Sequence, residues 1–237
     1  MSGHGPSGPA EVRASAARIV AGVIAHGRSL DDLLAADRED GSARGLKRSL
    51  CYGTLRWHHR LTAILNVLAS RPPEQLQPEL RALLEVGLYQ LVSGETAEHA
   101  AVAETVSAAR VLGLAKAAGF VNAVLRRFQR ERDAISHAVD RDLSLRTSHP
   151  RWFVDALKHD RGEAAALAVL DANNAHPPMW LRVNRMRSSV AEAESQLGAA
   201  GFSTTRHPLA PDALQVAPPT DVRALPGFAE GRVSVQD

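Results

Sequence analysis

The sequence is poor in cysteine, lysine and aromatic residues. Among its 237 residues there is one cysteine, Cys51, and aromatic side chains make up 4% of the chain. A single thiol excludes an internal disulfide and a multi-cysteine zinc site, and it predicts a reducing, cytoplasmic location. The scarcity of aromatic residues, beside abundant alanine, favours a helical bundle over a β-sandwich or barrel.

Long apolar runs are missing as well. No stretch of the sequence reaches the roughly eighteen apolar residues that a membrane-spanning helix requires. The first nine residues, rich in glycine, serine and proline, lack the basic and apolar segments of a signal peptide. These features predict a soluble chain with no membrane partner, and they predict that residues 1–9 form a flexible tail.

Arginine supplies nearly all of the positive charge. Lysine occurs only at Lys47, Lys116 and Lys158, and the formal net charge is +2. The planar guanidinium group suits two-pronged contacts with phosphate and stacking on bases. A GC-rich genome also enriches arginine and alanine, so only local clusters of arginine indicate RNA binding.

Two such clusters lie on predicted helices. The first falls within about one helical turn and extends along the same helix, and the second crowds the polar side of the last bundle helix. Basic patches of this kind contact a phosphate backbone and make binding depend on salt. A solvated helix face is the alternative interpretation. The RNA-binding candidates are Arg44, Lys47, Arg48, Arg56, Arg126, Arg127 and Arg130.

Residues 10–138 are predicted to form an all-helical bundle. Apolar residues recur there at three- and four-residue spacing. Ser29 is placed to cap a short helix, and Gly53, with the two histidines after it, is expected to break the segment 43–68. Further helices are expected over residues 79–92, 100–112 and 116–132. We predict six or seven short helices packed as one bundle.

Residues 139–237 change in character. The polar stretch 133–147 predicts a linker, and beyond it proline and glycine separate helix and strand signals. Helices are expected over residues 151–159, 162–172 and 190–200, and strands over residues 179–184, 213–216 and 232–235. Residues 201–205 are expected to form a turn into another strand. We predict that a helical pair precedes a small α/β (RRM-like) domain.

Three local patterns resemble a cofactor loop, a metal site and a catalytic cysteine, but their sequence context argues against each of these roles. The glycine pattern of residues 3–8 matches a dinucleotide-binding loop, but no strand precedes it and a proline removes a backbone donor. His58 and His59 are adjacent rather than one helical turn apart, which argues against a helical metal pair. Cys51 lies mid-helix without a neighbouring base, so a structural role is favoured. No metal site is predicted.

Several stretches carry a family likeness, in order along nearly the whole chain. Residues 50–56, 85–91, 99–106 and 120–128 resemble the antitermination factor NusB. They look more closely like the NusB-like domain that opens the Sun (Fmu, RsmB) family of ribosomal RNA cytosine-C5 methyltransferases. Residues 173–184 resemble the entry to the small domain that precedes the catalytic core of that family. The end of the chain, residues 225–237, resembles the hinge into the core.

The resemblance implies methyl transfer from S-adenosylmethionine to cytosine C5 of 16S ribosomal RNA. In that family a cysteine of the core attacks the base, and the cofactor lies in a doubly wound sheet behind a glycine-rich loop. No stretch of this sequence matches those motifs, so no catalytic or cofactor-binding residue is predicted and the core is expected to be absent. The chain is then the RNA-recognition portion, inactive alone and without bound S-adenosylmethionine. Its candidate partners are small-subunit ribosomal RNA and its own missing catalytic domain.

Two other functions stay open. A stand-alone NusB-like RNA-binding module, acting in transcription antitermination or ribosome assembly, would account for the bundle and the arginines but not for residues 173–237. A purely structural helical domain that binds protein partners is the third possibility. Salt-sensitive RNA binding would argue against this last one.

Overall fold

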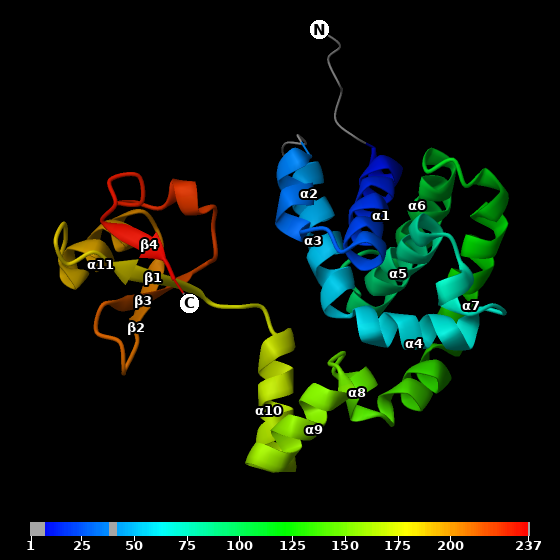
Figure 1. Ribbon diagram of the computed structural model, residues 1–237. Coiled ribbons are helices and arrows are strands. Elements are labelled where there is room, and N and C mark those ends of the chain that lie inside the picture. The colour runs from blue at the N-terminus through cyan, green and yellow to red at the C-terminus, as the bar shows by residue number, and fades with distance from the viewer. Residues whose placement is uncertain (1–7, 38–41, 237) are drawn as a thin grey trace, which may run out of the picture. The chain divides into compact units, whose positions relative to one another are not determined.

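The computed structural model describes residues 8–37 and 42–236 and divides into two units (Figure 1). The first unit runs to Asn174 and the second begins at Ala175. Most of the predicted tail and of the glycine pattern at residues 3–8 therefore lies outside the described residues.

The first unit is a helical bundle built around α5 (Pro78–Ser93). The other helices of the bundle are α1 (Pro9–His26), α2 (Leu30–Ala36), α3 (Ser42–Arg56), α4 (His58–Leu68), α6 (Glu98–Val111) and α7 (Ala118–Asp140). α5 packs against α1, α3, α4, α6 and α7, so its apolar residues cover most of its circumference. Leu83, Leu84 and Leu88 are fully buried there. The predicted helical bundle is confirmed.

Residues that favour helix ends mark the boundaries of these helices. The Ser29 hydroxyl accepts a hydrogen bond from the Asp32 backbone N–H at 3.4 Å, which confirms the predicted cap of α2. α1 ends at Gly27, whose φ of 63° lies in the left-handed region that favours glycine. α5 begins with Pro78, which lacks the N–H that the first turn would leave unpaired.

The break between α3 and α4 lies at Trp57, directly before the histidine pair, and not at Gly53. Trp57 has φ −96° and ψ 11°, whereas Gly53 is buried inside α3. A Cβ atom at Gly53 would lie 2.0 Å from Cζ of Tyr89. The prediction that this glycine breaks the helix is therefore wrong, because its physical role is to let α3 approach α5 closely.

The polar stretch 133–147, predicted as a linker, is largely helical. α7 continues through it to Asp140. Ile135 and Val139, four residues apart on one face, are buried in the core of the bundle. The guanidinium of Arg60 on α4 also donates two hydrogen bonds of 3.0 Å to the Asp140 carboxylate. The linker prediction is wrong because two buried side chains are enough to dock an otherwise polar helix.

Three further helices complete the first unit. They are α8 (Leu143–Arg146), α9 (Arg151–Arg161) and α10 (Glu163–Asn174). α8 packs on α4, α7 and α9, and α9 packs against α10. The Asn174 side-chain amide donates to the Thr147 carbonyl oxygen at 2.7 Å, which ties the end of α10 to the turn after α8. The sequence placed this helical pair in the region 139–237, whereas the contacts group it with the bundle.

The second unit is a four-stranded antiparallel sheet with one α-helix, α11 (Val190–Ala199). Its strands are β1 (Met179–Val183), β2 (Ser203–Arg206), β3 (Ala213–Ala217) and β4 (Val233–Val235), in the spatial order β2-β3-β1-β4. Leu181 of β1 pairs with Leu214 of β3 on one side and with Val235 of β4 on the other. The predicted small domain of strands and a helix is confirmed.

The core of the second unit lies between α11 and one face of the sheet. It contains Leu181, Val183, Leu214, Val216 and Val233 from the strands and Val190, Ala193 and Leu197 from the helix. Ser189 and Glu192 form a capping box that fixes the start of α11, with the Ser189 hydroxyl accepting from the Glu192 N–H at 3.2 Å. Because strand residues alternate, the neighbours of the buried positions point to the opposite face.

Candidate nucleic-acid interface

Two of the basic residues predicted on α3 are displayed at its surface. Arg44 and Arg48 are exposed and lie four residues apart, one turn along the same face. The Arg48 guanidinium lies 5.8 Å from the centroid of the Tyr52 ring, whose hydroxyl donates to Asp31 Oδ1 at 3.0 Å. Tyr52 is 37% exposed. An aromatic ring beside an arginine can meet both the base and the phosphate of a nucleotide.

Lys47 points inward, unlike its neighbours in the sequence. Its side chain is 4% exposed, and its ammonium group pairs with the Asp37 carboxylate. The same carboxylate accepts a hydrogen bond from the Ser15 hydroxyl at 3.1 Å, so the group joins α3 to α1. A buried charge is tolerated when it is paired in this way. This placement removes Lys47 from the exposed basic surface and gives it a role in packing.

Arg56 occupies the last turn of α3, where a positive charge suits the negative end of the helix dipole. Its side chain is half-buried near Tyr89 of α5. Burial raises the pKa of the Tyr89 hydroxyl, and the charge of Arg56 partly opposes that rise. The charge of Arg56 is therefore partly engaged within the bundle.

The predicted basic cluster on α7 also contains both exposed arginines and one that is engaged within the bundle. Arg126 and Arg130 are exposed and lie one turn apart. Arg127, between them, donates from Nη1 to the carbonyl oxygens of Val67 and Leu68 at 3.3 and 3.1 Å. Carbonyls at the C-terminal end of a helix have no partner within the helix. Arg127 therefore caps α4, and the exposed charge of the cluster comes from Arg126 and Arg130.

Acidic side chains lie beside the α7 cluster. Glu131 pairs with Arg127 at 3.1 Å, and Glu98 of α6 pairs with Arg132 at 2.7 Å. Glu98 also accepts a hydrogen bond of 2.7 Å from the Gln129 amide. Hydrogen bonds from Gln129 and Arg132 hold the pKa of the Glu98 carboxyl below its ordinary value. At neutral pH this face of α7 carries charges of both signs.

The two clusters lie on different helices that are well separated in Figure 1. α3 packs mainly on α1 and α5, whereas α7 packs on α4, α5 and α6. An RNA that touches both clusters has to run across the surface of the bundle. That Arg44, Arg48, Arg56, Arg126 and Arg130 contact RNA stays a prediction.

Cys51 is buried in the bundle and is unsuited to nucleophilic attack. It is 0% exposed, and its Sγ lies 3.9 Å from the carbonyl oxygen of Ala16. Burial raises the pKa of the Cys51 thiol to about 12, so the reactive thiolate is scarcely populated at neutral pH. This environment supports the predicted structural role.

The two adjacent histidines have different surroundings. His59 is exposed, whereas Nδ1 of His58 lies 2.8 Å from Oε2 of Glu85, a carboxylate that is fully buried in α5. Oε1 of Glu85 accepts further hydrogen bonds from Thr62 at 3.1 Å and Arg81 at 3.0 Å. Sequence spacing could not reveal this cluster, since Glu85 belongs to another helix. No group of three or more histidine, cysteine or acidic residues in the described part of the chain could hold a metal ion.

Comparison with known protein families decides what the bundle is. Residues 10–130, just over half of the chain, match the NusB family. The chain belongs to the NusB family. The NusB match runs from α1 into the middle of α7. Residues 149–223 match the ferredoxin-like domain of RsmF/B-like methyltransferases. The NusB domain is thus followed by a second, different module, as the sequence predicted.

This NusB-family chain is also similar, over nearly its whole length, to curated proteins named ribosomal RNA small subunit methyltransferase B. It is 44% identical to the Pseudomonas putida protein over 227 residues, which cover 95% of this chain and 52% of that protein. It is 40% identical to the Vibrio cholerae protein, with 95% and 52% covered. It is 38% identical to an Escherichia coli protein, with 95% and 53% covered. The chain spans about half the length of the curated relatives it matches.

A solved structure supports the fold of the NusB-family chain. The crystal structure of PH0851 matches with a TM-score of 0.63 and 18% sequence identity, covering 99% of this chain and 54% of that chain. At this identity the likeness concerns the fold alone. Within the residues described, no helix is long and apolar enough to cross a membrane.

Proposed function

We propose that this NusB-family chain is the RNA-recognition portion of an S-adenosylmethionine-dependent cytosine-C5 methyltransferase of 16S ribosomal RNA. The observation that carries the proposal is the match to a small subunit methyltransferase B protein at 44% identity through 95% of the chain. That match includes both units, whereas the NusB family accounts only for residues 10–130. Its RNA partner would place the chain in the cytoplasm.

The exposed arginines supply a means of holding RNA. Arg44 and Arg48 offer two charges on α3, with Arg48 beside the Tyr52 ring, and Arg126 and Arg130 offer two more on α7. Each guanidinium–phosphate contact releases counterions from the nucleic acid, so affinity falls as salt rises. The proposal therefore predicts RNA binding that is electrostatic in origin and distributed over two helices.

The described residues do not form a binding site suited to the methyl donor. All strand pairs of the sheet are antiparallel, and no parallel strand followed by a glycine-rich loop occurs in this part of the chain. That arrangement is the one by which doubly wound sheets hold nucleotide-like cofactors. The single thiol, Cys51, is buried away from any RNA that docks on the surface. The chain alone is expected neither to bind S-adenosylmethionine nor to methylate RNA.

A second candidate function is that of a stand-alone RNA-binding module in transcription antitermination or ribosome assembly. The match of residues 10–130 to the NusB family favours it. It leaves the second unit without a role, although residues 149–223 match a domain of methyltransferases. The two functions differ in the RNA they predict, because only the first requires a preference for small-subunit ribosomal RNA.

The test is a binding titration, followed by fluorescence anisotropy, with labelled fragments of 16S ribosomal RNA and an unrelated structured RNA of equal length. For four arginine–phosphate contacts, raising KCl from 50 to 200 mM should weaken binding about 50- to 150-fold. Changing Arg44, Arg48, Arg126 and Arg130 together to alanine should abolish most of this salt dependence. Each arginine removed should lower the slope of log affinity against log salt by about one.

The matched control is Arg71→Ala combined with Arg110→Ala. Both residues are exposed and lie outside the two clusters, so their loss should leave the salt slope unchanged. Equal affinity of the four-residue variant and the unchanged chain would refute the assignment of the arginine surfaces. Equal affinity for the two RNAs would favour the stand-alone module. If the unchanged chain binds neither RNA, both candidate functions are refuted.

A further inference from the structure

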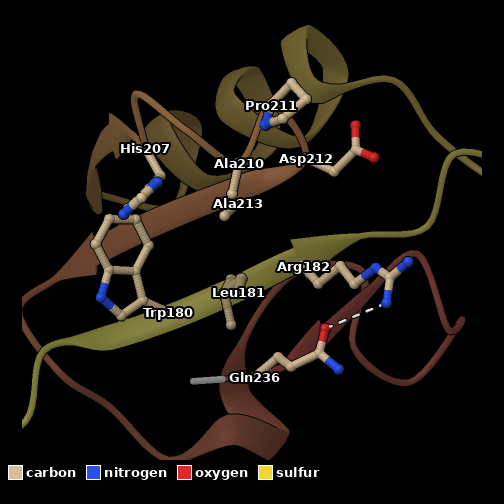
Figure 2. A pocket seen from close by; sticks show the side chains of 9 residues that line it. All are labelled: Trp180, Leu181, Arg182, His207, Ala210, Pro211, Asp212, Ala213 and Gln236. Atoms are coloured by element: carbon tan, nitrogen blue, oxygen red, sulfur yellow. Dashed lines mark hydrogen bonds between the residues drawn. The ribbon is translucent and has the colours of Figure 1, made fainter.

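The second unit carries a pocket of about 480 Å³ on its sheet. Trp180 and His207 stand at one end of this pocket, and Arg182 and Asp212 stand toward the other, with Gln236 along its side (Figure 2). The pocket arises from the alternation of β1, whose buried residues face the core with α11. Trp180 and Arg182, at the alternate positions of this strand, therefore project from the other face.

Trp180 forms an aromatic wall of this pocket. Its ring and the His207 ring meet at 73°, with centroids 5.1 Å apart. This edge-on arrangement orients the indole, and it covers at most one of the two indole faces. The backbone around the indole is also fixed, because the Gln236 N–H donates to the Trp180 carbonyl oxygen at 3.1 Å. The wall is therefore preformed for a planar ligand.

Arg182 places a positive charge at the other end of the pocket. Its Nη1 donates to Oε1 of Gln236 across 3.4 Å, and it forms no ion pair with any residue from 8 to 37 or 42 to 236. The nearby Asp212 is instead paired with Arg185 at 2.8 Å. A guanidinium without a carboxylate partner, beside an aromatic wall, is suited to an anion that is attached to a flat ring.

We infer that this pocket binds one unpaired nucleotide of an RNA strand. Its base stacks on Trp180, the edge of the base faces the Gln236 amide, and its phosphate meets Arg182. The inference rests on the proposed function. Sheets of four antiparallel strands are known to stack unpaired bases on aromatic side chains of an open face. A nucleotide joins a flat ring to an anion in one ligand, which an apolar protein segment does not.

The first experiment uses Trp180 as its own reporter. The chain contains three tryptophans, so Trp57→Phe combined with Trp152→Phe leaves Trp180 as the only indole. This variant is titrated with a single-stranded decamer of uridine and cytidine, and with the same decamer in a duplex. The unpaired strand should quench Trp180 emission by stacking. The duplex, whose bases are already stacked and paired, should not.

The second experiment measures affinity for the unpaired decamer. Trp180→Ala should weaken binding about 5- to 150-fold, as expected for the loss of one stacked base. Trp180→Phe should retain most of the affinity, and Arg182→Ala should lower the salt slope by about one. Trp152→Ala is the matched control, since it removes a 72% exposed indole from the first unit and should change nothing.

The outcomes separate the inference from the proposed function. If the unchanged chain binds no RNA, the proposed function and the nucleotide pocket are both refuted. If the unchanged chain binds RNA and the Trp180→Ala variant binds the unpaired decamer as tightly as the Trp152→Ala variant does, only the nucleotide pocket is refuted. A further outcome is a Trp180 emission that changes with protein concentration when no RNA is present. That result would show that a second copy of this chain occupies the pocket, and it would overturn the inference. If the Trp180→Ala variant does not fold, the quenching experiment on the single-tryptophan variant tests the inference. Absence of quenching by the unpaired strand then refutes it.

Discussion

At the scale of single residues, Glu85 is a fully buried carboxylate that three neighbours satisfy. His58, Thr62 and Arg81 all lie within 3.1 Å of its oxygens. Glu85→Ala should lower the free energy of unfolding by about 3 kcal/mol, because it leaves the partly buried Arg81 guanidinium and Thr62 hydroxyl without their acceptor. Urea unfolding followed by circular dichroism measures this, with the exposed Glu74→Ala as control. A loss no larger than that of the control would show that solvent replaces the carboxylate.

Cys51 makes a residue-scale prediction about pH. Its folded pKa of about 12 lies above that of an unfolded thiol, so the folded chain holds the proton more tightly. The resulting stabilisation is complete below the unfolded pKa and is lost as pH rises toward the folded one. At pH 10.5 the unchanged chain should have lost about 2 kcal/mol relative to Cys51→Ala, compared with pH 7.5. Parallel pH profiles of the two proteins in urea unfolding would contradict this.

The basic residues show what the sequence could and could not predict at this scale. Their helices were predictable from apolar spacing, and the structure places Arg44 and Arg48 on an exposed side of α3. The inward turn of Lys47 was not predictable, because its partner Asp37 lies at the end of another helix, α2. Arg127 caps a helix that precedes it by about sixty residues, and local spacing carries no information about such a partner.

At the scale of elements, two glycines of α3 make a matched pair. A Cβ at Gly53 would lie 2.0 Å from Tyr89, whereas a Cβ at Gly45 would meet nothing within 4 Å. Gly53→Ala should destabilise the bundle by about 1–3 kcal/mol through overpacking against α5. Gly45→Ala should stabilise it by up to about 1 kcal/mol, because alanine favours the helix. Thermal unfolding of both variants checks the opposite signs, and equal shifts would contradict the close approach of α3 and α5.

The helices and strands were more predictable than their boundaries. The Ser29 cap and the apolar spacing of α5 act locally, so the sequence alone indicated α2 and α5. The segment 133–147 is rich in polar residues, and its helix is stabilised because Ile135 and Val139 pack into the core of the bundle. Such docking depends on the tertiary structure, which local composition does not encode.

At the scale of the whole molecule, two modules with different chemistry follow one another. The NusB domain presents arginines on separate helices, and the second unit presents an aromatic pocket with Arg182, which forms no ion pair among the described residues. The first surface suits a phosphate backbone of any sequence, and the pocket suits an unpaired base. Together they would favour a structured RNA that also exposes a single-stranded segment.

This division leads to a prediction about catalysis by the chain itself. Methyl transfer to cytosine C5 needs a bound donor and an accessible nucleophile, yet the sheet is antiparallel and Cys51 is buried. Calorimetric titration with S-adenosylmethionine should show no stoichiometric heat, and 16S ribosomal RNA should take up no labelled methyl group. The same preparation should bind that RNA, which controls for inactive protein. Saturable donor binding at one site per chain would require a cofactor site that the antiparallel sheet does not provide.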